Sequence, residues 1–286
     1  MHISDYFKTN LLFDSHAHLT NYISKESKEI QQRDLKLIVS RATQNNVGFI
    51  LDMGVNIQSS KQVIENAITF KDKIFAFVGI DPEIFIPGTS LFIVKNLSND
   101  WFDNSYNSLK KLIEKHRNVI KGVGECGIDF YWLKNLNKMD AERSKSFQLK
   151  LFDLHLNLAE AFNLPLSIHS RGAENECLMI VKSRQNIRGI FHSYTGSYDV
   201  AKKILDIGWG LGINGISTFK KGDLIREMYK KIIGDIKLSD PQEFYNKGLF
   251  FETDSPFLSP EGKRGEVNEP SNTKIIFDSF VKTLIN

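Results

Sequence analysis

The sequence predicts an α/β protein, a single TIM (β/α)8 barrel domain over residues 1–286. Short apolar runs alternate with amphipathic helical patterns eight times along the chain. This alternation implies parallel strands joined by right-handed crossovers. The chain of 286 residues is also close to the roughly 250 residues typical of such a barrel. Buried parallel strands read as continuous apolar runs, as these segments do.

Each predicted strand is an apolar run, and a helical pattern follows it. The strands lie near residues 11–16, 47–53, 74–80, 119–124, 164–169, 189–193, 207–213 and 248–253. The helices lie near residues 29–46, 57–71, 104–117, 141–162, 173–185, 198–206, 222–233 and 272–285. Three long connections, 81–103, 126–140 and 255–271, follow strand ends, where barrel enzymes build their sites. The lysine-rich segment 214–247 is expected to be a helical insertion before the last strand.

The composition is that of an ordinary soluble globular protein, with 41% apolar and 25% charged residues. The net charge of +3 neither proves nor forbids a nucleic-acid partner, since only a local patch need be basic. Cys126 and Cys177 form no Cys-x-x-Cys pair, so a reducing compartment is expected. No signal peptide of the usual form and no apolar run of about 20 residues is seen, so a cytoplasmic location is expected, with a nuclear location or unconventional secretion left open. No membrane partner is expected, and no obligate protein partner is evident from the sequence.

Histidines and carboxylates lie at the ends of several predicted strands. His16 and His18 form a His-x-His pair, and strand alternation points both rings to one face. One imidazole alone is more often a packing residue than a ligand, whereas six such groups at one mouth of a barrel indicate a divalent metal site. The six predicted ligands are His16, His18, Glu125, His169, His192 and Asp254.

Six ligands exceed the needs of one tetrahedral ion and suit two ions about 3.5–4 Å apart that share one carboxylate. Glu125 is the natural bridge in the predicted strand order. Such a pair lowers the pKa of a shared water and clamps a phosphoryl or carbonyl oxygen. Asp254 would ligate one ion and accept the proton of the attacking water, and Asp14 would support the site by bonding a ring N–H.

Five motifs in order resemble the TatD family of metal-dependent deoxyribonucleases, within the amidohydrolase-like barrels, over about residues 12 to 272. The motifs are Phe13–Leu19, Gly122–Tyr131, Leu164–Ala173, Phe191–Gly196 and Glu252–Leu258, and the tail Arg264–Pro270 is also family-like. The resemblance implies hydrolysis of DNA phosphodiesters, often as a 3′ exonuclease, with two divalent ions (Mg, Mn or Zn). It implies that one ion is held by His16, His18, Glu125 and Asp254, and the other by Glu125, His169 and His192.

The chain departs from this pattern at two positions. Asp81 stands in Gly79–Pro82, where the family often has a substrate-contacting histidine, and it would put negative charge near a phosphate. His155 stands where a glutamine is usual in the long helix. Neither position is expected to be a ligand, so these departures bear on substrate fit, rate and metal preference.

Four residues are candidates for substrate binding. Arg171 and Arg264 follow ligand-bearing strands and would meet phosphates of single-stranded DNA or strand ends. Tyr131 and Trp132 follow Glu125 and either stack on a base or cap the barrel. The lysines between 220 and 231 are expected to form a solvated helix face, with steering of nucleic acid as the alternative.

Two rival functions remain open at the level of sequence. One is hydrolysis of another ester bond, such as deacylation of a D-aminoacyl-tRNA, which needs the same activated water and oxygen clamp. The other is a non-catalytic nucleic-acid-binding protein with a structural metal, and six ligands disfavour it because a structural ion needs about four.

Overall fold

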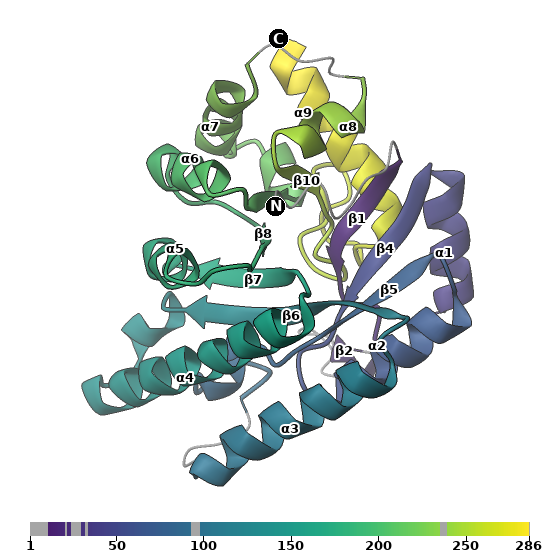
Figure 1. Ribbon diagram of the computed structural model, residues 1–286. Coiled ribbons are helices and arrows are strands. Elements are labelled where there is room, and N and C mark those ends of the chain that lie inside the picture. The colour runs from purple at the N-terminus through teal and green to yellow at the C-terminus, as the bar shows by residue number, and fades with distance from the viewer. Residues whose placement is uncertain are drawn as a thin grey trace. The chain divides into compact units, whose positions relative to one another are not determined.

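The computed structural model describes residues 11–20, 22–23, 30–31, 34–92, 98–234 and 239–285. Eight strands form one sheet in the order β1-β4-β5-β6-β7-β8-β9-β10, with parallel pairing. They alternate with helices along the chain, so the predicted TIM (β/α)8 class is confirmed (Figure 1). The strands are β1 (Leu12–Ala17), β4 (Val47–Met53), β5 (Ile74–Val78), β6 (Ile120–Asp129), β7 (Leu166–Arg171), β8 (Gly189–Phe191), β9 (Gly210–Ile213) and β10 (Leu249–Phe251).

A helix is found in each of the eight predicted helical segments. These helices are α1 (Leu35–Gln44), α2 (Ile57–Thr69), α3 (Asn99–Lys115), α4 (Lys138–Phe162), α5 (Glu174–Lys182), α6 (Tyr198–Asp206), α7 (Asp223–Ile233) and α9 (Thr273–Ile285). A further helix, α8 (Pro241–Asn246), lies between α7 and β10. Short 3-10 turns η2 (Pro82–Phe85), η3 (Trp132–Asn135), η4 (Gly215–Thr218) and η5 (Pro270–Asn272) lie in the connections. Among the described residues, no helix is both long and apolar enough to cross a bilayer.

Several predicted boundaries are wrong; α3, for example, begins at Asn99 rather than near 104, inside the connection expected over 81–103. The helix expected from residue 29 begins at Leu35, because Asp34 caps it by accepting a hydrogen bond from the Leu37 N–H. Ahead of it, β3 (Ile30–Gln31) pairs with β2 (Tyr22–Ile23). The loop expected from 126 begins only after Asp129, because β6 continues its pairing with β7 to that residue.

Other predicted segments are described only in part. Segment 214–247 holds η4, α7 and α8, and its residues 235–238 lie outside the described residues. The same holds for residues 93–97 of the long connection 81–103, and for 29 and 32–33 of the first predicted helix.

The chain divides into two compact units, and the expectation of a single domain stays a prediction. The first unit comprises residues 1–52, 72–74 and 190–286, and the second comprises 53–71 and 75–189. In the first unit, Phe13 of β1 stacks on Phe49 of β4 with ring centroids 4.4 Å apart, and Tyr245 stacks on Phe250 at 5.4 Å. A further cluster of aromatic rings joins α8, β10 and α9, namely Phe244, Phe251, Phe277 and Phe280.

The second unit is organised around α4, which packs along β6 and against α3. Four aromatic rings, those of Phe85, Trp101, Phe102 and Phe147, meet between η2, α3 and α4 with centroids 5.1 to 6.0 Å apart. Cys126 and Cys177 are both buried and both reduced. Burial raises the pKa of each thiol well above its ordinary value, so they act as small apolar core residues.

Candidate metal centre

In the first unit, β1 and the segment after β10 bring three predicted ligands together. The Nε2 atoms of His16 and His18 lie 3.2 Å apart. Oδ1 of Asp254 lies 3.8 Å from the His16 nitrogen and 3.5 Å from the His18 nitrogen. Two imidazole nitrogens and one carboxylate oxygen that face one point are the donors a divalent cation takes.

Backbone pairing between the ends of β1 and β10 fixes this arrangement. The Asp254 N–H donates to the His16 carbonyl (2.9 Å), and the His18 N–H donates to the Ser255 carbonyl (2.7 Å). Asp254 has a φ of +55°, in the left-handed region that non-glycine residues rarely adopt. Such conformations recur at functional sites, where the surrounding structure enforces them. Here the enforced turn aims the carboxylate at the two rings.

Asp14 supports the backbone of these strands rather than a ring N–H. Its Oδ1 accepts from the backbone N–H of His16 (3.2 Å) and of Thr253 (2.9 Å), and its Oδ2 accepts from the Thr253 hydroxyl (2.6 Å). Burial raises the pKa of Asp14 to about 8, against the opposing effect of the Thr253 bonds. Asp14 therefore ties β1 to the segment after β10, two residues before His16.

The fourth predicted ligand of this unit, His192, packs face to face with His16. Their ring centroids are 3.8 Å apart with an angle of 10° between the planes. Nδ1 of His192 lies 3.7 Å from Oε1 of the buried Glu252, and the same carboxylate accepts from the Ser193 N–H. Burial raises the pKa of Asp254, but the His18 hydrogen bond and the positive potential of the three imidazoles outweigh it and lower the pKa. Asp254 is thus ionised at neutral pH, as the sequence predicts.

In the second unit, His169 of β7 lies between two carboxylates of β6. Its Nδ1 is 3.0 Å from Oε1 of Glu125, and its Nε2 is 3.1 Å from Oδ2 of Asp129. Burial alone would lower the pKa of His169, but the hydrogen bonds to Asp129 and Glu125 raise it well above its ordinary value. A histidine that ligates a metal through one nitrogen commonly donates the other N–H to a carboxylate, as His169 and Asp129 are placed to do.

The segment after β5 adds two carboxylates to this group. Donor atoms of Asp81, Glu125 and His169 all lie within 4.8 Å of one another, and so do those of Glu83, Asp129 and His169. Burial, followed by the negative charge of Glu125, raises the pKa of Asp81 well above its ordinary value. Asp81 thus lies among the ligand candidates, which the sequence did not predict.

His155, the second departure from the family pattern, contacts the same segment. Its Nε2 accepts from the Ile80 N–H (3.0 Å), and its Nδ1 lies 2.8 Å from the Leu151 carbonyl. The neutral ring satisfies both contacts, with Nδ1 as the donor and Nε2 as the acceptor. Burial lowers the pKa of His155 to about 4, which keeps the ring neutral. The two departures, Asp81 and His155, are therefore linked through one backbone segment.

The donor atoms of both units fit divalent cations, but with different chemistry. The nitrogen-rich set comprises His16, His18, His192 and Asp254 of the first unit. The oxygen-rich set comprises Asp81, Glu83, Glu125, Asp129 and His169 of the second unit. Three imidazoles with one carboxylate suit zinc-like ions, whereas carboxylate-rich sets suit Mg²⁺ or Mn²⁺.

Three of the predicted substrate-binding residues gather in the second unit. The Arg171 guanidinium lies over the Tyr131 ring at 4.1 Å and over the Trp132 ring at 5.1 Å. Lys134 Nζ also lies 3.6 Å from the centre of the Tyr131 ring. A base that stacks on Tyr131 must share the ring with these cations or displace one of them. Tyr131 as a residue is 40% exposed, so a nucleotide can reach it from solvent.

The fourth predicted substrate-binding residue, Arg264, belongs to the first unit. Its guanidinium lies 4.3 Å from the centre of the Phe219 ring. Further along the same connection, Asn268 donates to the carbonyls of Thr253 (2.9 Å) and Phe257 (2.7 Å). The family-like tail therefore holds the segment around Asp254 as well as carrying a cation.

Sequence reasoning missed Asp81, Glu83 and Asp129 as members of the oxygen-rich set. Two signals were available. Asp129 lies four residues after Glu125, so strand alternation puts both on one face. Asp81 and Glu83 directly follow a buried strand, where barrel enzymes place site residues.

Comparison with known proteins agrees with the metal-site chemistry. The family model described as "TatD related DNase" matches residues 13–284. The "Uncharacterized metal-dependent hydrolase YabD" of Bacillus subtilis is 30% identical, over 95% of this chain and 91% of its own. A protein of Enterocytozoon bieneusi named "Putative deoxyribonuclease TATDN1 homolog" is 29% identical, over 68% of this chain and 65% of its own.

A solved structure shares the fold. The crystal structure of YJJV, a TatD homologue from Escherichia coli K12, superposes with a TM-score of 0.70 at 22% identity, covering 96% of this chain and 95% of that one. With the family match over nearly the whole sequence, these similarities establish that the chain belongs to the TatD family and is a metal-dependent hydrolase.

Proposed function

We propose that the protein is a metal-dependent deoxyribonuclease that hydrolyses DNA phosphodiester bonds. The observation that carries the proposal is the convergence of His16, His18 and Asp254 in one unit and of Glu125 and His169 in the other. The chain belongs to the TatD family, and these are the groups that its sequence resemblance to the family's motifs implies as ligands. The substrate is proposed to be single-stranded DNA or strand ends, digested from 3′ to 5′.

Each donor set is proposed to hold one divalent ion, Mg, Mn or Zn. His16, His18 and Asp254 supply one set of donors, and Glu125 and His169 supply the other, with His192 predicted to serve the same ion as Glu125 and His169. The sharing of Glu125 by two ions stays a prediction. When bound, such ions lower the pKa of a water and neutralise charge on a phosphoryl oxygen.

Asp254 is proposed to accept the proton of the attacking water. Its lowered pKa keeps the carboxylate ionised at neutral pH, which a proton acceptor needs. The water oxygen attacks phosphorus, the bond from phosphorus to the 3′ oxygen breaks, and that oxygen takes up a proton from solvent and leaves as the new 3′ hydroxyl, with the phosphate on the released nucleotide. Arg171, with Tyr131 and Trp132 beneath its guanidinium, is proposed to contact a backbone phosphate. Arg264 is proposed to contact a second one.

The test is digestion of a 5′-labelled single-stranded DNA with added Mg²⁺ or Mn²⁺. We expect wild type to shorten the DNA stepwise from its 3′ end. Loss of a direct ligand in Glu125→Ala should reduce the rate at least about 100-fold, the upper range for losing an outer-shell partner. Asp199→Asn, at an exposed position of α6, is the matched control and should retain full activity.

The outcomes separate the candidate functions. No cleavage by metal-loaded wild type would exclude DNA as the substrate and would favour an ester such as a D-aminoacyl-tRNA, to be tested with that substrate. Equal cleavage by wild type and Glu125→Ala would contradict the assignment of Glu125. Products that shorten from the 5′ label inward would overturn the proposed polarity alone.

A further inference from the structure

We propose that Asp81 is a direct ligand of the cation held by Glu125 and His169, and that it gives this site a preference for Mg²⁺ or Mn²⁺ over Zn²⁺. The inference rests on the proposed metal-dependent function and adds a ligand to it. Asp81, Glu125 and His169 each offer one donor atom, and these atoms lie within 4.8 Å of one another. That spacing matches three donors around one ion, since ligand bonds are about 2.0 to 2.6 Å long.

Charge supports the same conclusion. The side chains of Asp81 and Glu125 are buried, with 5% and 3% of their surface exposed. Two carboxylates buried close together destabilise the fold unless a proton or a cation offsets their repulsion. A divalent cation between them, with the imidazole of His169 as the third donor, removes this cost without protonating either group.

The orientation of His169 indicates which side the cation occupies. Its Nε2 contacts Oδ2 of Asp129 at 3.1 Å, and its Nδ1 faces Glu125. The Asp129 carboxylate accepts from the ring. The Asp129 N–H donates to Oε1 of Gln148, and the Asp129 carbonyl accepts from Nε2 of Gln148, so these two bonds hold Asp129 in place as a partner of His169. The cation therefore belongs on the Nδ1 side, beside Glu125.

The backbone holds Asp81 rigidly in place. Its Oδ1 accepts from the Glu83 N–H at 2.6 Å and so caps the turn η2, and its own N–H donates to the Val55 carbonyl at 3.1 Å. This cap uses Oδ1, and one further oxygen is enough for monodentate binding of a cation. On the preceding residue, the Ile80 N–H is fixed by His155.

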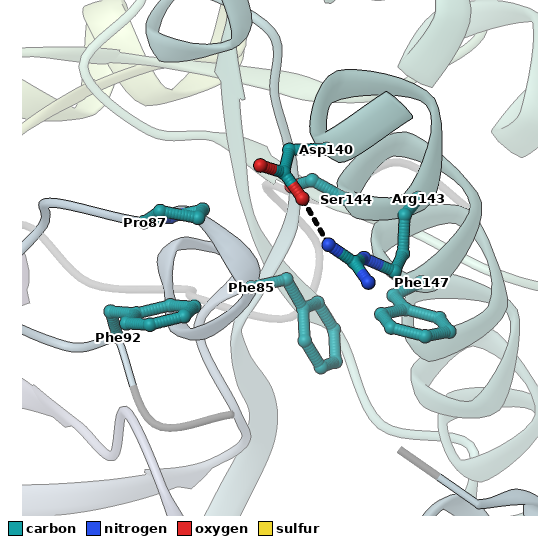
Figure 2. A pocket seen from close by; sticks show the side chains of 7 residues that line it. All are labelled: Phe85, Pro87, Phe92, Asp140, Arg143, Ser144 and Phe147. Carbon is teal, nitrogen blue, oxygen red and sulfur yellow. Dashed lines mark hydrogen bonds and ion pairs between the residues drawn. The ribbon is translucent and has the colours of Figure 1, made fainter. Parts of the chain in front are cut away.

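Aromatic packing anchors the other end of the turn. Phe85, the last residue of η2, contacts Phe147 of α4 with ring centroids 5.5 Å apart. Figure 2 shows both rings at a cavity of about 310 Å³, together with the ion pair between Asp140 and Arg143. None of the ligand candidates lines this cavity. The contact between Phe85 and Phe147 beside it supports the turn that carries Asp81. A ligand held at both ends needs little reorganisation to bind a cation.

The donor composition determines the preferred cation. Two carboxylate oxygens and one imidazole nitrogen form a harder set than the three imidazoles of the first unit. Mg²⁺ and Mn²⁺ favour oxygen ligands, whereas Zn²⁺ favours nitrogen and sulfur. Replacing the Asp81 carboxylate should therefore affect Mn²⁺ binding more than Zn²⁺ binding.

The test is titration of the full chain, freed of metal by a chelator, with Mn²⁺ and separately with Zn²⁺ in a calorimeter. Asp81→Asn is the informative variant, because asparagine keeps the cap on the Glu83 N–H and removes only the charge. We expect it to weaken one Mn²⁺ site at least about tenfold and to weaken Zn²⁺ binding less. Asp103→Asn, at an exposed position of α3, is the matched control.

The outcomes distinguish this inference from the proposed function. If wild type binds neither ion, the proposed function itself fails. If Glu125→Ala loses a site while Asp81→Asn titrates like wild type, the role of Asp81 is overturned and the proposed function stands. If Asp129→Asn abolishes the site and Asp81→Asn does not, the cation lies on the Nε2 side. An equal loss of Mn²⁺ and Zn²⁺ affinity would overturn the preference. Circular dichroism of each variant checks that it folds.

Discussion

The two donor sets differ in the charge of the side chains that they bury. In the nitrogen-rich set, imidazole rings pack against each other, and His16 stacks on His192 at 3.8 Å. In the oxygen-rich set, four carboxylates surround one imidazole, and the pKa of Asp81 rises because burial and Glu125 disfavour its charge. The second set therefore depends on a cation or on protons to offset the repulsion between its carboxylates, whereas in the first set a single carboxylate, that of Asp254, faces imidazole rings.

The largest expected effect comes from replacing Asp254, the proposed proton acceptor, in the nitrogen-rich set. Asp254→Asn keeps the shape of the side chain but removes the proton acceptor, which typically contributes about 10²- to 10⁴-fold to the rate. We expect kcat to fall by this factor in the DNA digestion assay, with Asp199→Asn as the control. A variant that retains the wild-type rate would show that the proton goes elsewhere.

Metal selectivity tests the difference between the sets directly. His18→Gln removes an imidazole from the first set and should lower Zn²⁺ affinity more than Mg²⁺ affinity. Asp129→Asn weakens the support of His169 in the second set, and loss of such a partner costs about 10- to 100-fold in metal affinity. Calorimetric titration of both variants with both ions gives the answer. Identical selectivity changes in the two variants would contradict the claim that the first set suits Zn²⁺ and the second suits Mg²⁺ or Mn²⁺.

His155 tests how the backbone beside the oxygen-rich set is held. His155→Ala leaves the buried Ile80 N–H without its acceptor, which costs about 1–3 kcal/mol of unfolding free energy. His155→Gln supplies another acceptor and should lose less. Urea unfolding of both variants measures the difference. If the alanine and glutamine variants are equally stable, the hydrogen bond to Ile80 is not what His155 contributes.

The lowered pKa of His155 also predicts how the free energy of unfolding depends on pH. The pKa of His155 falls from 6.5 to about 4 in the folded chain, so below pH 6.5 the unfolded chain binds a proton that the folded chain rejects. The stability from the neutral ring is complete above about pH 6.5 and is lost as the pH falls to about 4, by up to about 3 kcal/mol. Unfolding curves of wild type and His155→Gln should therefore converge at acid pH. Parallel curves across this range would contradict the prediction.

The smallest expected effect concerns the two predicted phosphate contacts. Arg171→Ala should raise KM for DNA about tenfold and reduce its salt dependence, because one phosphate contact is lost. Arg171→Lys keeps the charge but not the planar stacking on Tyr131, so it should fall between wild type and alanine. Arg264→Ala should have a similar effect through the first unit. An unchanged salt dependence in both alanine variants would exclude these residues as phosphate contacts.

Much of the fold was predictable because it depends on local patterns. Each of the eight strands overlaps one of the predicted apolar runs, because strands buried between helices consist mainly of apolar residues. The boundaries that failed depend on other factors. Strand β6 continues to Asp129 because β7 supplies pairing partners for those residues, which the sequence of β6 alone does not reveal. Helix α1 begins at Leu35 because Asp34 caps it there, although the helical sequence pattern extends further upstream.

The candidate site was predictable where strand position alone decides it. His16 and His18 share a face by alternation, and Asp254 follows a strand, so the pattern was enough to group them. The membership of Asp81 was not predictable as a contact, because it depends on the turn η2, on the His155 bond to Ile80 and on packing of Phe85. Asp14 was predicted to bond a ring and instead bonds backbone N–H groups.

The sequence by itself determined the fold class, the six ligand candidates and the family, because apolar periodicity and ordered motifs are local properties of the chain. Only the tertiary structure decided which further carboxylates join them and how each side chain is held. Asp81, Glu83 and Asp129 come close to His169 through a capped turn and a long strand pair, and these contacts arise between segments far apart in sequence. Burial, which raises the pKa of Asp14 and Asp81 and lowers that of His155, is likewise a property of the packed chain.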